Sequence, residues 1–172
     1  GQDYSAARGW AQPVDVFRVS RLIEEKYSAA RVKANDLIMT IVGYCGHVEI
    51  VPNWLDGANI TQTTARIAIQ SDKADALFCK YMIQSSYVQR QVAAFLKGNA
   101  QPGLNCGDVE KFLVPLPPTY SEQRAIAEAL KGSDQLIGEL EGLIEKKRLI
   151  KQGAMQELLS GRRRLPGFDG EW

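Results

Sequence analysis

The stretch VPLPPTYSEQRAIAEAL, residues 114–130, divides the chain into two parts of different character. Its closely spaced prolines cannot lie inside a helix or a central strand, so a boundary falls here. Thr119 and Glu122, three residues apart, have the spacing of a capping box at the start of a helix. The periodic pattern that follows predicts one helix over residues 121–159. We therefore expect a compact domain over residues 1–118, a long helix over 119–161 and a tail or linker over 162–172.

The predicted helix is too long for one face to rest on a domain of this size. At 1.5 Å per residue it extends roughly 55–60 Å, and each of its internal glycines weakens it by about 1 kcal/mol relative to alanine. We therefore expect it to need a partner helix rather than to pack along its own domain. Its apolar residues follow the alternating four- and three-residue spacing of a coiled-coil seam: Ile126, Leu130, Ile137, Leu140, Ile144, Ala154 and Leu158.

The charge along this helix indicates how a partner helix lies. Residues 119–143 carry a net charge of −3, and residues 144–164 carry +5. Two copies in parallel would place like charges side by side, whereas an antiparallel pair places the acidic half against the basic half. Exposed pairs contribute little one by one, but a field of this size can select orientation. We therefore predict an antiparallel coiled coil.

The part before the prolines has the pattern of a small α+β domain in which the sheet dominates. Strand-like runs cover residues 14–19, 36–42, 47–51, 65–70 and 112–114, and no strand is expected before Val14. The second and third runs are separated by Gly-Tyr-Cys-Gly, which is typical of a hairpin turn. Between residues 74 and 97 apolar residues recur at three- and four-residue spacing, which predicts a helix that ends at Gly98 and Asn99.

Composition excludes several classes of protein. The 172 residues carry a net charge of +1, so a protein that grips nucleic acid by bulk positive charge is excluded. No apolar run is long enough to cross a membrane, and three widely spaced cysteines fit neither a disulfide framework nor a zinc site. We expect a cytoplasmic protein without cofactor or metal. The chain shows no phosphate-binding loop, methyl-donor loop or nuclease cluster, and its only histidine is His47.

Residues 114–130, followed by DQLIGELEGLIEKKRLIKQGAMQELLSGRRRLPGFDGEW over residues 134–172, closely resemble one known family. This is the conserved region of the specificity subunit of Type I restriction-modification systems. The preceding domain is similar to the family's target recognition domain, through Asn35-Asp36-Leu37-Ile38, Gly43 and Gly46, and through ITQTTARI at residues 60–67.

The resemblance implies a non-catalytic DNA reader. Family members have two recognition domains alternating with two conserved helices, which pack antiparallel as a spacer, and each domain reads one half of a split target on double-stranded DNA. Methyltransferase (modification) subunits dock on them, and a motor-nuclease subunit joins for cleavage. With one domain and one helix, this chain resembles half of such a subunit, either a fragment or a short form that forms a homodimer.

Three groups of residues are candidates for reading bases, because amides and guanidinium groups pair with base edges and Thr contacts either an edge or a methyl group. The alternative is that these polar residues only form the solvent-exposed face of a strand and contact no base. Candidate phosphate contacts are Arg18, Arg21, Arg31 and Lys33. For Arg162, Arg163 and Arg164 the alternatives are binding to DNA or a partner, and capping of the helix C-terminus. The base-reading candidates are Asn59, Thr61, Gln62, Thr63, Thr64 and Arg66; then Lys97, Asn99, Gln101 and Asn105; and finally Tyr44 and His47 at the hairpin.

Two rival functions remain open at this point. One is a coiled-coil adaptor that binds protein and reads no bases. The other is the recognition part of a fused restriction-methylation enzyme, whose catalytic residues lie elsewhere. Enrichment of a DNA motif from random duplexes distinguishes the first rival from a specificity subunit.

Overall fold

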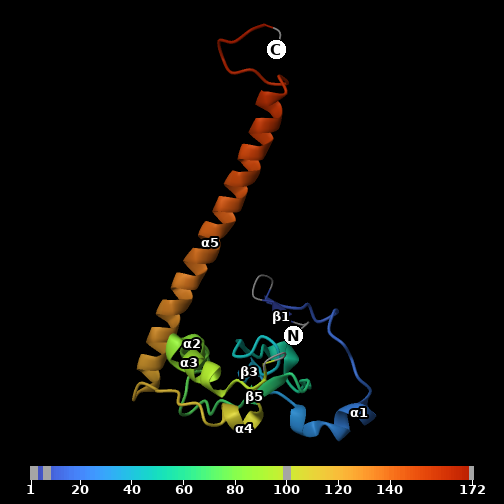
Figure 1. Ribbon diagram of the computed structural model, residues 1–172, viewed down its shortest axis with the longest axis vertical. Coiled ribbons are helices and arrows are strands. Elements are labelled where there is room, and N and C mark those ends of the chain that lie inside the picture. The colour runs from blue at the N-terminus through green and yellow to red at the C-terminus, as the bar shows by residue number, and fades with distance from the viewer. Residues whose placement is uncertain (1–3, 6–8, 99–101, 171–172) are drawn as a thin grey trace. The chain divides into compact units, whose positions relative to one another are not determined.

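The structure is a computed structural model that describes residues 4–5, 9–98 and 102–170. It is an α+β fold, as the sequence predicts (Figure 1). The elements in chain order are β1 (Tyr4–Ser5), β2 (Gly9–Trp10), α1 (Arg21–Lys26), the 3-10 turn Ser28–Ala30, β3 (Leu37–Thr40), β4 (Val48–Ile50), the 3-10 turn Asn53–Leu55, β5 (Thr64–Ile67), α2 (Ala76–Gln84), α3 (Ser86–Phe95), α4 (Cys106–Val109) and α5 (Tyr120–Leu159).

Strand β3 is the centre of a three-stranded antiparallel sheet with the order β4-β3-β5. Leu37 and Met39 alternate with Ile38 and Thr40 along it, so the first pair points to one face of the sheet and the second pair to the other. Leu37 and Met39 are fully buried in the hydrophobic core. The predictions of strands within residues 36–42, 47–51 and 65–70 are confirmed, although each strand is shorter than its apolar run.

Helices α2 and α3 cover the inner face of the sheet, and Figure 1 shows them side by side next to it. Asp75 caps α2, because its side chain accepts a hydrogen bond from the Phe78 backbone N–H at 2.8 Å. The single helix predicted over residues 74–97 is wrong: the chain is extended at Ser85, with ψ of 154°, and two helices result. The Gln89 side-chain amide donates to the Ile83 carbonyl oxygen near the end of α2, and also to the Gly46 carbonyl oxygen in the hairpin turn.

Two strand predictions are also wrong. Residues 14–19 form no strand: a turn follows Gln12, and Val14 and Phe17 are exposed and pair with no strand among the residues that the structure describes. Residues 112–114 form none because the Gln91 side-chain amide hydrogen-bonds both backbone groups of Leu113, each at 2.9 Å, in place of a partner strand. The unexpected strands are β1 and β2, a short antiparallel pair in which Tyr4 lies opposite Trp10.

The structure divides into two compact units, Gly1–Ala127 and Glu128–Trp172. The first unit includes the first two turns of α5, where Gln123 and Ala127 are buried. Thr119 caps this end: its hydroxyl oxygen accepts from the Glu122 backbone N–H at 3.3 Å, as predicted. The second unit consists of the rest of α5 and the turns that follow it. No helix in the described parts of the chain is long and apolar enough to span a bilayer.

Gln123 fixes the start of α5 to the rest of the first unit. Its side chain is buried, with the residue only 2% exposed. The Gln123 Oε1 atom accepts from the Asp75 backbone N–H at 2.9 Å, and its Nε2 atom donates to the carbonyl oxygens of Pro117, at 3.1 Å, and Lys73, at 3.3 Å. One side chain therefore joins the boundary segment, the α2 cap and α5.

We expect Gln123→Ala to lower the free energy of unfolding of the first unit by about 2–3 kcal/mol, because it leaves three partly buried backbone groups without the partner that they have in the fold. The matched control is Gln135→Ala, on the exposed surface of α5, which should change stability by less than about 0.5 kcal/mol. Urea denaturation followed by tryptophan fluorescence measures both. Equal, small effects would show that Gln123 does not hold this junction.

Candidate functional site

Three separate segments meet where β3 ends. The Ile41 backbone N–H donates to the Thr63 carbonyl at 2.9 Å, which brings in the loop before β5. The Ile41 carbonyl accepts from the Leu104 N–H at 2.8 Å, and the Gly43 N–H donates to the Pro102 carbonyl at 3.2 Å, which brings in the segment after α3. The hairpin turn of residues 43–46 lies between these two. We call this place the β3 end: the turn 43–46, residues 61–64, and Lys97 with Pro102 and Gly103.

All three groups of candidate base-reading residues thus have members at the β3 end. Tyr44 lies on the hairpin turn with 84% of its surface exposed. Gln62 is exposed, while the hydroxyl groups of Thr61 and Thr63 are 2.8 Å apart and that of Thr64 donates to the Thr61 carbonyl at 3.0 Å. Tyr44 and Gln62 therefore have the freest side chains of the group. Candidates Asn99 and Gln101 lie outside the described residues.

Lys97 holds a buried carboxylate. Its Nζ atom lies 2.9 Å from both carboxylate oxygens of Asp108, whose side chain is 3% exposed. The ammonium group of Lys97, followed by the backbone N–H of Asn105, keeps the pKa of Asp108 below its usual range. Asn105 also accepts from the Asp108 N–H at 2.9 Å and completes the capping box of α4. Lys97 and Asn105 thus have structural partners already.

Two further candidates are held within the domain in the same way. The Asn59 side-chain amide donates to the Tyr27 carbonyl at 2.8 Å. The Arg66 guanidinium lies 2.5 Å from the buried carboxylate of Asp36. These bonds give both residues a role in fixing loops and leave Tyr44, Gln62 and the threonines as the side chains that a ligand meets first.

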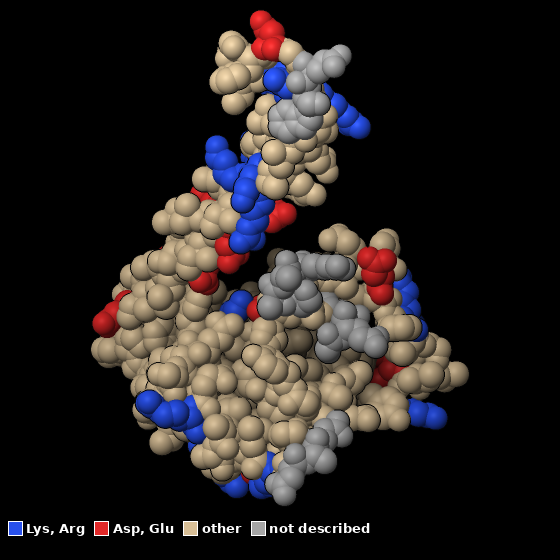
Figure 2. All heavy atoms as spheres, turned by 45° about the horizontal axis from the view of Figure 1, so that its top comes forward, with Lys and Arg blue, Asp and Glu red and all other residues tan. Residues whose placement is uncertain are grey.

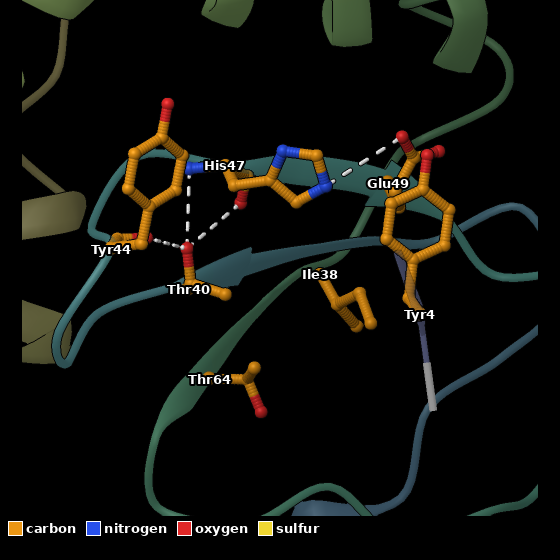
Figure 3. A pocket seen from close by; sticks show the side chains of 7 residues that line it. All are labelled: Tyr4, Ile38, Thr40, Tyr44, His47, Glu49 and Thr64. Carbon is orange, nitrogen blue, oxygen red and sulfur yellow. Dashed lines mark hydrogen bonds and ion pairs between the residues drawn. The ribbon is translucent and has the colours of Figure 1, made fainter. Parts of the chain in front are cut away.

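A pocket of about 260 Å³ opens on the outer face of the sheet beside the β3 end. Its floor is formed by strand side chains that point away from the core. Figure 3 shows the His47 ring pointing toward the Glu49 carboxylate, with the Tyr4 hydroxyl beside the same carboxylate. Burial and then hydrogen bonding to Glu49 raise the pKa of Tyr4. The lining residues are Tyr4, Ile38, Thr40, Tyr44, His47, Glu49 and Thr64.

The sequence analysis selected Tyr44, His47 and Thr64 of this set and missed the other four. Strand periodicity contains a signal for two of the missed residues, because Ile38 and Thr40 alternate with the buried positions of β3. For Tyr4 and Glu49 periodicity contains no such signal. Tyr4 belongs to a strand that the sequence did not predict, and Glu49 is an acidic residue that is buried in the fold.

On the face of the first unit that Figure 2 shows, the described lysine and arginine side chains form no single basic surface. Arg31 pairs with Glu24, and Figure 2 shows lysine and arginine side chains scattered over the compact unit on the face in view. Within the described residues, no group of three or more His, Cys, Asp or Glu side chains is placed to hold a metal ion.

The apolar seam of α5 is exposed. Every residue from 128 to 157 is exposed, including Leu130, Ile137 and Leu140. Leucine and isoleucine side chains in contact with water along several successive turns of a helix form a surface that normally packs against another protein element. Of the predicted seam, Ile126, Leu130, Ile137, Leu140, Ile144 and Ala154 are exposed, and Leu158 is partly buried.

Comparison with known families matches residues 4–149 to the Type I restriction modification DNA specificity domain. The chain belongs to this family. It is 28% identical over 148 residues to the MjaVIII specificity subunit of Methanocaldococcus jannaschii, covering 84% of this chain and 35% of that protein. It is 30% identical over 109 residues to the EcoBI specificity subunit of Escherichia coli, covering 63% of this chain and 23% of that protein. The resemblance that the sequence suggested is therefore confirmed.

Solved structures show the same fold. The HsdS subunit from Thermoanaerobacter tengcongensis matches with a TM-score of 0.63 at 23% identity, over 82% of this chain and 36% of that one. The S subunit from M. genitalium matches with a TM-score of 0.59 at 22% identity, over 75% of this chain and 33% of that one. The chain thus spans about a third of the length of these specificity-domain proteins.

The Lys97–Asp108 pair predicts a pH-dependent effect. An Asp whose pKa is lowered by folding stabilises the fold above the ordinary carboxyl pKa of about 3.9, and that contribution is lost as the pH falls through the lowered value. We expect Lys97→Met to destabilise the protein at pH 7 and to match wild type once Asp108 is protonated. Urea denaturation at pH 7 and at steps below pH 4 measures this, with the exposed Lys33→Met as control. A difference that does not change with pH would contradict the assignment.

Proposed function

We propose that this chain is a non-catalytic, sequence-specific DNA-binding half of a Type I restriction-modification specificity subunit, which reads one part of a bipartite target. The observation that carries the proposal is the β3 end, where three distant segments present hydroxyl, amide and aromatic groups together. Membership of a DNA specificity family supports the same assignment. Methylation and cleavage then belong to partner subunits.

Side chains at the β3 end suit base reading in the major groove. Gln62 can pair bidentately with adenine, and threonine can contact either a base edge or the thymine methyl group. Tyr44, on the hairpin turn, adds an exposed aromatic surface. Because the chain carries a net charge of only +1, the phosphate contribution is small, so the affinity of the isolated chain is modest and depends weakly on salt.

The second part of the proposal concerns α5, which pairs antiparallel with a like helix and docks the methyltransferase subunits. The exposed apolar seam needs a cover, and the acidic first half and basic second half of the helix are complementary only when antiparallel. In this chain alone the like helix belongs to a second copy, which makes a homodimer; in a longer protein it belongs to a second repeat. A motor-nuclease subunit joins through the assembled complex.

Selection of bound duplexes from a random library tests the DNA part. We expect the full chain, alone or with a modification subunit, to enrich one motif. Gln62→Ala should relax one position of the motif by tenfold or more, in line with about 1–3 kcal/mol for a bidentate contact, and Tyr44→Ala should weaken binding. The control Arg90→Ala, exposed on α3, should leave the motif unchanged. Failure to enrich any motif would favour the adaptor alternative.

Light scattering and cross-linking test the helix part. We expect a dimer of about twice 19.1 kDa. The Ile137→Asp variant should be a monomer, because pairing would bury its carboxylate among the apolar side chains of the seam. The control Gln135→Ala, on the outer side of the same turn, should remain dimeric. Carbodiimide cross-linking of mixed labelled and unlabelled chains should join acids of residues 119–143 to lysines of residues 144–151 in the other copy. A monomeric wild-type chain would contradict the pairing.

A further inference from the structure

The pocket on the outer face of the sheet is continuous with the β3 end. Thr40 and Tyr44 belong to the β3 strand and the turn that follows it, and Thr64 begins β5 opposite Thr40. A DNA strand held at the β3 end would therefore pass the mouth of the pocket. At about 260 Å³ the pocket is smaller than the roughly 300–1,000 Å³ sites of drug-sized ligands, so it suits a single ring system.

The walls of the pocket suit a flat ligand. The Tyr4 and His47 rings are close, with centroids 5.1 Å apart and planes tilted by 32°. Ile38 supplies an apolar floor, and Tyr44 adds a third ring (Figure 3). Stacking on aromatic side chains above an apolar floor is the way in which proteins hold an unpaired nucleobase.

The charge inside the pocket is balanced. The Glu49 side chain is 10% exposed, and its Oε2 atom lies 2.8 Å from the Lys80 ammonium, which reaches it from α2. Because this ion pair neutralises the carboxylate, the pocket offers little net attraction to a cation or an anion. It favours a neutral ligand.

The polar groups of the pocket define the ligand further. Glu49 Oε1 lies 3.8 Å from His47 Nε2, too far for a hydrogen bond. The His47 Nε2 atom is buried and has no hydrogen-bond partner among the described residues. A buried polar atom without a partner is uncommon in a folded protein and marks a place where a ligand or water completes the bonding. The ligand that fits offers an N–H donor to Glu49 and a second polar atom to His47.

We propose that this pocket holds one unpaired cytosine, the DNA base that combines a single ring with an exocyclic amino group beside a ring nitrogen that can accept a hydrogen bond. The inference rests on the proposed function, since it places the base in DNA bound at the β3 end. A carboxylate accepts a hydrogen bond from the amino group of cytosine. Thymine fits less well, because its single N–H donor lies between two carbonyl oxygens, which the Glu49 carboxylate repels.

A binding assay with the full chain tests this. The probes are hairpin duplexes, identical except for one base placed opposite an abasic site, which leaves that base unpaired. We expect the duplex with unpaired cytosine to bind about tenfold more tightly than the one with thymine, as suits one hydrogen bond to a charged group. Because His47 is the only histidine in the sequence, its imidazole NMR signals report the pocket alone, and cytosine but not thymine should shift them.

Two variants separate the carboxylate from the ion pair that it makes. Glu49→Gln removes the charge-assisted acceptor and should abolish the preference for cytosine. Lys80→Gln breaks the same ion pair but leaves the carboxylate facing the pocket, so the preference should persist. Circular dichroism and thermal unfolding confirm that both variants fold.

The outcomes distinguish the two proposals. Duplex binding with equal affinity for cytosine and thymine, and unshifted His47 signals, overturns the pocket assignment and leaves DNA recognition standing. Loss of the preference in Lys80→Gln as well as Glu49→Gln overturns it too, since the ion pair rather than the acceptor would be responsible. Absence of binding to any duplex, with or without a modification subunit, contradicts the proposed function itself.

Discussion

The alternation of side chains along β3 is the constraint on which the rest of the domain depends. Because Leu37 and Met39 point into the core that α2 and α3 cover, Ile38 and Thr40 must point to the opposite face. The same short strand thus builds the core on one side and the pocket floor on the other. The backbone groups of Ile41 and Gly43, which directly follow β3, hold the neighbouring loops, so the position of the β3 end follows from the register of one strand.

The features that could be predicted from the sequence are those that depend on residues close together in the chain. The strands β3, β4 and β5 and the helix α5 were predicted because periodicity and capping are properties of neighbouring residues. The break at Ser85 was not, since apolar spacing continues across it and the bonds that accompany the break involve the Ser85 hydroxyl and the Gln89 side chain. The candidate base readers were chosen as three separate groups. That members of all three groups meet at one end of the sheet depends on long-range pairing, which residue types do not reveal.

Helix α5 combines two roles along one continuous element. Its first turns belong to the compact unit, where Gln123 bonds three backbone groups, and from residue 128 to 157 every residue is exposed. A helix exposed on all sides gains little stability by itself in water, whatever its propensity. The exposed seam therefore offers a surface for the pairing that we propose, and the division of charge along the helix favours the antiparallel direction of that pairing.

Photochemical cross-linking tests most directly the claim that the β3 end is the DNA-reading surface. The full chain is bound to its selected duplex carrying 5-iodouracil at each thymine position in turn, irradiated, digested and mapped by mass spectrometry. The account predicts cross-links to Tyr44 and to the peptide containing residues 61–64. Cross-links confined to the exposed side of α3, with none on either of these segments, would contradict it.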